Sequence, residues 1–175
     1  HGSVLFRDRP EWFVKDQLTG SPLIAHLNPD WGSDFICYSL DTTNPQVQSW
    51  LKHIFSTLVA YGFTYFKIDF LVAGIRRGNR YDRYSSRAEA YRKGLDIIRK
   101  AIGPDCYLVG CGAPLGPSIG YFDAMRVSSD TNAEWDEMFL QRILGAGDGP
   151  PCLRNALHFL YFLNCLVYNL LLKFF

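Results

Sequence analysis

The sequence predicts an α/β fold with parallel strands, on three observations. Between residues 34 and 127, short apolar runs alternate with longer stretches of helical periodicity, which is typical of parallel βαβ units. Apolar residues make up 48% of the chain, enough to form a core. Polar residues follow the predicted strands at their carboxyl ends, where parallel α/β folds gather their functional groups.

The first predicted strand covers residues 35–40, and the first helix follows it. Asn44 is a suitable N-cap and Pro45 takes the favoured first helical position, ahead of apolar residues at helical spacing. Gly62 is expected to end this helix in a left-handed conformation. These signals predict the first strand–helix unit.

The second predicted strand, residues 63–70, begins the next unit. Ser86 and Glu89 form a capping box at the start of the second helix. Further strands are predicted over residues 107–111 and 124–127. The linker between these two is too short for a full crossover helix, and periodicity does not explain that departure.

Composition excludes several classes of protein. A net charge of +1 with scattered Lys and Arg gives no basic stripe for nucleic acid. The five cysteines show neither C-x-x-C spacing nor a histidine cluster, so we expect no disulfide framework and no structural zinc. The chain starts at His1 rather than Met and shows no signal peptide, so the true N-terminus is expected to be missing and the cytoplasm is favoured weakly as location.

The apolar tail, residues 156–175, differs from the rest of the chain. Residues 156–172 contain no Asp, Glu, Lys or Arg, which is the lower limit of length for a membrane span. Asn164, Asn169 and the preceding Arg154 favour a buried helix of the fold, and no membrane association is expected. Loss of the native sequence by truncation or a shifted reading frame stays a third possibility.

Three predicted strand ends carry the chemistry. Lys67 and Asp69 are two residues apart, so they project from the same face of their strand, and the ammonium keeps the carboxylate ionised. The alternative is that Lys67 and Asp69 form an ion pair with a purely structural role. Cys111 and Gly112 end the next strand in a turn of small residues, and Arg126 precedes Asp130 after the last strand. Two carboxylates on neighbouring strand ends indicate a retaining glycosidase.

Two further sets of polar residues are predicted to be structural. Asp41 ends the first strand, and we favour a hydrogen bond to the neighbouring strand end over a catalytic role. The arginines of the loop after Asp69 are predicted to form a solvated surface rather than to grip an acidic substrate. They are Arg76, Arg77, Arg80 and Arg83.

The sequence resembles glycoside hydrolase family 36, the α-galactosidases often called melibiases. The similarity runs in collinear order from about Leu5 to Leu157. It is carried by Tyr65-Phe66-Lys67-Ile68-Asp69-Phe70, the loop reaching Arg80-Tyr81-Asp82, Arg87-Ala88-Glu89-Ala90-Tyr91-Arg92, Gly110-Cys111-Gly112-Ala113-Pro114, and Asp123-Ala124-Met125-Arg126-Val127 leading to Asp130.

This resemblance implies a partial (β/α)8 TIM barrel, with residues 1–175 as part of a catalytic domain. It implies a retaining α-galactosidase, with Asp69 as nucleophile and Asp130 as acid/base, acting on galactosides such as raffinose or melibiose. It also implies no cofactor. The positions that match its galactose subsite are Lys67, Cys111, Gly112 and Arg126.

The sequence departs from the family in three places. The Asp-Asp-Gly-Trp segment that helps to bind galactose is missing, as are the flanking β-domains. Ser128-Ser129 stands before Asp130 where a pair containing Gly or Pro is expected, and the similarity fades after Leu157. We therefore expect a fragment of a larger enzyme, weakly active or inactive alone. A homo-oligomeric full-length enzyme is an open possibility.

Two other functions stay open. A transferase of the raffinose-synthase type would use the same two aspartates on a sugar acceptor. A non-catalytic, degenerate barrel domain would keep the strands without the complete site. A nucleotide-binding domain is excluded because no glycine-rich loop joins a strand to a helix.

Overall fold

The computed structural model describes residues 3–27 and 36–126. Asp130 and the apolar tail predicted at residues 156–175 lie outside the described residues. The elements, in chain order, are α1 (Val4–Asp8), the 3-10 helix η1 (Pro10–Trp12), β1 (Ile24–Leu27), β2 (Ile36–Tyr38), α2 (Pro45–Ala60), β3 (Tyr65–Ile68), the 3-10 helix η3 (Leu71–Ile75), α3 (Arg87–Ile102), β4 (Tyr107–Gly110), α4 (Leu115–Ser118) and β5 (Ala124–Met125).

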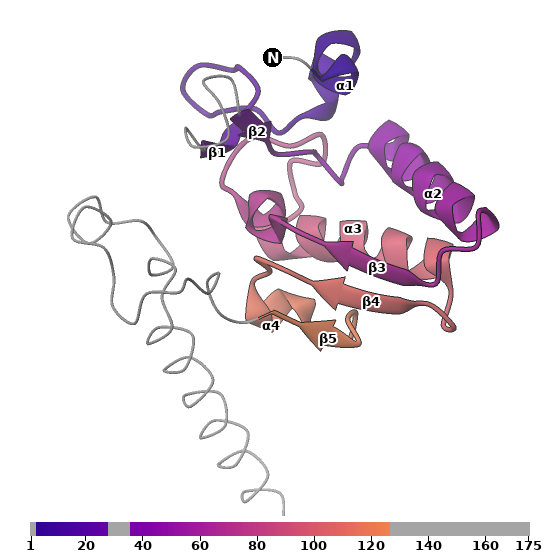
Figure 1. Cartoon of the computed structure of the whole chain (residues 1–175). Coiled ribbons are helices and arrows are strands. Elements are labelled where there is room, and N and C mark those ends of the chain that lie inside the picture. The colour runs from indigo at the N-terminus through magenta and orange to yellow at the C-terminus, as the bar shows by residue number, and fades with distance from the viewer. Residues whose placement is uncertain (1–2, 28–35, 127–175) are drawn as a thin grey trace, which may run out of the picture. The chain divides into compact units, whose positions relative to one another are not determined.

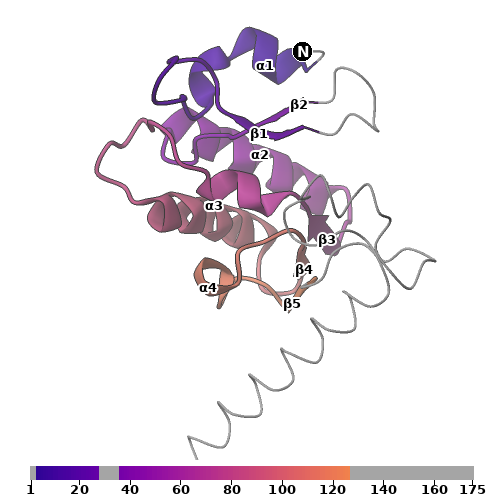
Figure 2. The ribbon, with the colours of Figure 1, turned by 90° about the vertical axis from the view of Figure 1, so that its left-hand side faces the viewer.

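A three-stranded parallel sheet in the order β3-β4-β5 is the centre of this unit (Figure 1). Helices α2 and α3 lie on one side of the three strands (Figure 2). Their apolar side chains form a core with Phe66 of β3 and Leu108 of β4, both of which are buried. The predicted α/β fold with parallel strands is therefore confirmed.

The other face of the sheet is open in the described part of the chain. Tyr65 on β3 and Tyr107 on β4 are exposed there, and their rings stack at 5.7 Å between centroids. Lys67 is exposed on the same face. Because side chains alternate along a strand, each strand presents one set of residues to the helices and the other to this open face.

The helix boundaries follow the predicted capping signals. The Asn44 side chain accepts a hydrogen bond from the backbone N–H of Gln46, and Pro45 is the first helical residue of α2. Ser86 and Glu89 make the complete capping box of α3. Gly62 follows α2 with a φ of 91°, as predicted.

The strand predicted at residues 35–40 is the main correction. It is shorter, as β2, and it pairs antiparallel with β1 in a separate two-stranded sheet instead of joining β3. A second apolar cluster around Trp12, Phe13 and Val47 packs η1 and the start of α2 together. β1 was not predicted, so the sequence gave no partner for an antiparallel pairing.

One short linker completes the unit. The short linker before β5 contains the one-turn helix α4, which agrees with the prediction that no full crossover helix fits there. The three parallel strands by themselves do not show a closed barrel. Among the described residues, no helix is long and apolar enough to cross a membrane.

Candidate active site

The strand register brings three predicted site residues into one row. Ile68 of β3 is aligned with Gly110 of β4, and Gly110 with Met125 of β5. The next residue on each strand is therefore Asp69, Cys111 and Arg126. Backbone hydrogen bonds continue the alignment past the strand ends, since the Cys111 N–H donates to the Ile68 carbonyl at 2.9 Å and the Arg126 N–H to the Gly110 carbonyl at 2.8 Å.

The row belongs to the open face of the sheet. Asp69 is two residues after Lys67, and both residues are exposed. The side chain of Phe66 projects to the opposite, helix-covered face and is buried. By the same alternation, Cys111 shares the open face with Val109, and Arg126 with Ala124. We call Asp69, Cys111 and Arg126 the strand-end row.

The surroundings of Asp69 keep its carboxylate ionised. Partial burial pushes its pKa up, but a hydrogen bond from the Cys111 thiol, a hydrogen bond from the Phe70 N–H and the charges of Arg126 and Lys67 act against burial and hold the pKa below its usual value. The Phe70 N–H lies 2.7 Å from Asp69 Oδ1. An ionised, oriented carboxylate is suited to nucleophilic attack.

Cys111 is a neutral thiol at physiological pH. Its side chain is fully buried, and burial raises its pKa, as do the hydrogen bond to Asp69 and the negative charge of Asp69; the pKa is about 11. A protonated thiol is a weak hydrogen-bond donor and a poor nucleophile. In the strand-end row this thiol lies beside Asp69.

A tight turn after β3 meets the turn after β4 at Gly112. Phe70 has a left-handed backbone with φ 54° and ψ 31°, and Gly112 also has a positive φ of 54°. The Val72 N–H donates to the Gly112 carbonyl at 2.7 Å, so the two turns are joined. A Cβ at Gly112 would lie 3.5 Å from Asp69 Oδ1 and would force a side chain into a strained backbone. Glycine leaves this approach to the carboxylate open.

A small cavity of about 270 Å³ opens beside Asp69. Apolar side chains from β2, α2, η3 and α3 make up most of its lining, and Asp69 is the charged group on it. Because α2 and α3 contribute much of this lining, the cavity lies mainly on the helix-covered side of the sheet rather than on the open face to which Asp69 projects.

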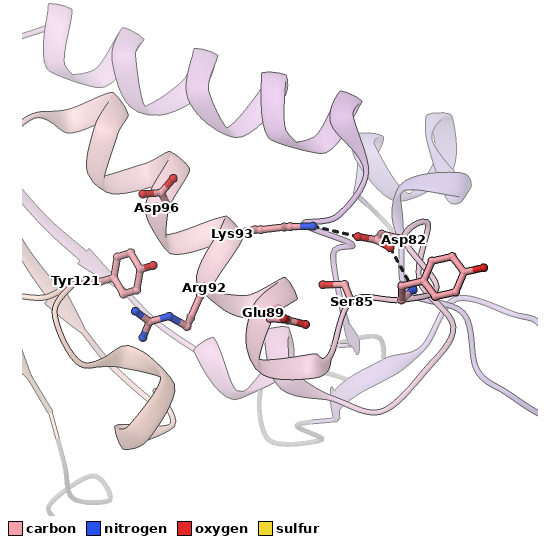
Figure 3. Close-up of a pocket in the computed structure, with 8 residues that line it drawn as sticks. Asp82, Ser85, Glu89, Arg92, Lys93, Asp96 and Tyr121 are labelled. Carbon is pink, nitrogen blue, oxygen red and sulfur yellow. Dashed lines mark hydrogen bonds and ion pairs between the residues drawn. The ribbon is translucent and has the colours of Figure 1, made fainter.

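Two larger hollows lie elsewhere on the described surface. One, of about 430 Å³, lies along α3, and Figure 3 shows Lys93 reaching the Asp82 carboxylate at its rim, 3.0 Å away. The other, of about 660 Å³, lies between the N-terminal segment and the loop that ends at Ser85. Neither contains a residue of the strand-end row.

The residues predicted to be structural divide into two groups. Asp41 is buried and accepts hydrogen bonds from Thr43 and from the Tyr81 N–H, which supports a structural role. The predicted partner is wrong, because these donors belong to its own turn and to a loop rather than to the neighbouring strand end. Arg80 is also buried, and its guanidinium donates to the carbonyls of Gly78, Gly74 and Arg76. The prediction of a solvated arginine is therefore wrong for Arg80, which organises its own loop.

In residues 3–27 and 36–126, no three His, Cys, Asp or Glu side chains are placed to hold a metal ion.

The left-handed turn at Phe70 was not predicted, because a bulky aromatic residue gives no sequence signal for that conformation.

No family model matches the sequence. Two solved structures of an α-galactosidase from Thermus thermophilus, one in complex with stachyose and one with p-nitrophenyl α-D-galactopyranoside, match 90% of this chain at 35% identity and a TM-score of 0.74. The chain is related to the α-galactosidases. It spans about a third of their length, 32% of the first matched chain and 30% of the second. The resemblance stated from sequence motifs is confirmed.

Proposed function

We propose that this chain is part of the (β/α)8 barrel of a retaining α-galactosidase, and that Asp69 is the nucleophile. The observation that carries the proposal is the Asp69 carboxylate itself. It stands after a parallel strand on the open face of the sheet, and despite partial burial its pKa is held low by Cys111, the Phe70 N–H, Arg126 and Lys67. The relationship to the α-galactosidases supplies the substrate class.

The proposed reaction has two steps. An Asp69 oxygen attacks the anomeric carbon, the bond to the leaving oxygen breaks, and Asp130 donates its proton to that oxygen. Asp130 then takes a proton from water, which displaces Asp69 and releases galactose with its original configuration. This two-carboxylate chemistry needs no metal or organic cofactor.

The remaining predicted site residues are proposed to line the galactose subsite. Lys67 is exposed beside Asp69 and carries three N–H donors that suit sugar hydroxyls. Arg126 adds a second cation at the far end of the row. Gly112 has no side chain, so a sugar ring can approach its backbone. Raffinose and melibiose are the proposed substrates.

The barrel is supported by the two faces of the parallel sheet. Helices α2 and α3 cover one face of β3 and β4, as the outer helices of such a barrel do. The open face carries Tyr65, Lys67 and Tyr107, which the proposal places toward the barrel interior. The 175-residue chain alone is expected to be weakly active or inactive, because half a barrel leaves sheet edges unpaired.

Azide rescue tests the nucleophile. In the gene product that carries this chain, Asp69→Gly is expected to reduce turnover of an aryl α-galactoside by roughly 10⁶-fold, the scale seen when a nucleophile is removed. Sodium azide should restore turnover and yield β-galactosyl azide. The matched control is Asp105→Gly, an exposed aspartate in the turn before β4.

Leaving-group dependence tests Asp130. Asp130→Ala should reduce hydrolysis of melibiose and raffinose far more than that of an aryl galactoside with an activated leaving group, which needs no protonation. Near-normal activity of Asp69→Gly, or equal losses of Asp130→Ala on both classes of substrate, would contradict the proposed roles.

A further inference from the structure

Cys111 is the middle residue of the strand-end row, with Asp69 on one side and Arg126 on the other. Its backbone is held from the β3 side at two points. The Cys111 N–H donates to Ile68, and the Cys111 carbonyl accepts from the Leu71 N–H at 3.4 Å. With the side chain fully buried, the thiol has a fixed place beside the Asp69 carboxylate.

Asp69 depends on a small number of neighbours for its orientation. Its side chain is exposed on the open face, yet Oδ1 is held by the Phe70 N–H at 2.7 Å, an interaction within the turn itself. Cys111 follows the neighbouring strand β4 at the level of Asp69 and on the same face, so its thiol is the donor from that strand placed beside the carboxylate. Donors from two strands fix the plane of a carboxylate better than one donor from its own turn.

We propose that Cys111 is a positioning residue, whose thiol donates a hydrogen bond to Asp69 and holds the carboxylate in the orientation from which it attacks. This role differs from the contact with galactose that the family resemblance implies. It rests on the proposed function of Asp69 as nucleophile.

A thiol suits this task because it is a weak donor. A stronger donor, such as a hydroxyl, would draw more charge from the carboxylate and make it a poorer nucleophile. The thiol orients Asp69 and leaves most of its basicity in place. The thiol also stays protonated across the working range, because its own pKa is about 11.

Several charged and titratable groups surround Asp69, and they come from separate elements. Lys67 precedes it on β3, and Arg126 follows β5. The His26 ring on β1 packs against Phe70 at 5.3 Å. Cys37 and Tyr91 line the cavity beside Asp69. All of these groups remain in a Cys111 variant, so a change in the Asp69 pKa reports the thiol.

The test is a pH titration of the Asp69 carboxyl carbon by ¹³C NMR in the 175-residue chain. Cys111→Ala removes the donor and should raise the pKa of Asp69, whereas Cys111→Ser supplies a stronger donor and should keep the Asp69 pKa at or below its wild-type value. Cys106→Ala is the matched control, since Cys106 is a buried cysteine just before the same strand and has no role at Asp69. It should leave the Asp69 pKa unchanged.

The same variants are then assayed in the gene product that carries the chain. The acid limb of kcat/KM against pH should move upward in Cys111→Ala by as much as the Asp69 pKa, with Cys111→Ser closer to wild type. An acid limb and an Asp69 pKa that both stay at their wild-type values in Cys111→Ala would overturn the proposal. If Cys111→Ala fails to fold, Cys111→Val provides the same comparison.

The outcomes separate this proposal from the proposed function. A changed KM with an unchanged Asp69 pKa would assign Cys111 to substrate contact alone and overturn the positioning role. A raised Asp69 pKa in a protein that shows no galactosidase activity would leave the hydrogen bond in place and defeat the proposed function instead.

Discussion

The two faces of the parallel sheet differ in what their side chains do. On the helix-covered face, Phe66 and Leu108 are buried in a continuous apolar core. On the open face, Lys67, Asp69 and Arg126 bring charges together at the strand ends. Neighbouring residues on one strand therefore have different roles, one in the apolar core and the other at the candidate active site. Substitutions on the covered face should change stability, and substitutions on the open face should change chemistry.

The largest expected effect on stability is at Leu108, which is fully buried on the covered face. Leu108→Ala should lower the free energy of unfolding by about 3 kcal/mol, because it removes buried methyl groups and leaves a cavity. Urea denaturation measures the loss. Leu18→Ala is the matched control, since Leu18 is 96% exposed, and it should change stability by less than about 0.5 kcal/mol. Equal losses in the two variants would contradict the assignment of faces.

A smaller loss of stability is expected on substitution of Gly110, which ends β4 on the covered face. An added Cβ would lie 2.8 Å from the Phe122 ring, so the ring would have to move. Gly110→Ala should cost about 2 kcal/mol, in the range of overpacked cores. In contrast, a Cβ at Gly116 would meet nothing within 4 Å, and Gly116→Ala should be close to neutral in the same urea titration. A neutral Gly110→Ala would show that the β4–Phe122 contact is looser than described.

On the open face, Lys67→Met should separate chemistry from stability. Lys67 is exposed, so its removal should change the free energy of unfolding by less than about 0.5 kcal/mol. The pKa of Asp69 should rise, because a positive charge that favours the carboxylate is lost. Urea denaturation and ¹³C NMR on the same sample test both parts. A large loss of stability without a rise in the pKa would argue for the structural ion pair.

The smallest effect concerns the pH dependence of stability at Asp69. Its pKa is lower in the folded state than in the unfolded chain, so its contribution is present above the unfolded value of about 4 and is lost as the pH falls through the folded value. The stability difference between wild type and Asp69→Asn should therefore shrink as the pH drops below about 4. A difference that grows with acid would have the wrong sign for this account.

Local signals predicted the covered face well. The caps of α2 and α3 depend on residues three or fewer positions apart, and Asn44 and the Ser86–Glu89 pair were sufficient to place them. The projection of Lys67 and Asp69 to one side also follows from the two-residue period of a strand. These features need no knowledge of distant partners.

Long-range features could not be predicted in the same way. The alignment of Cys111 and Arg126 beside Asp69 depends on registers between strands that are far apart in sequence. The pairing of β2 was missed for another reason, because its partner β1 was not predicted as a strand. Arg80 was predicted to be solvated because its charge was visible in the sequence, whereas the carbonyls that it caps were not.

Covalent trapping tests the central claim most directly. The gene product that carries this chain is incubated with 5-fluoro-α-galactosyl fluoride, which slows the second step and lets a galactosyl-enzyme accumulate. Peptide mapping by mass spectrometry is predicted to find one sugar per chain, attached to Asp69, and no label in Asp69→Asn. A label on another carboxylate, or an unlabelled protein that still hydrolyses galactosides, would contradict the account.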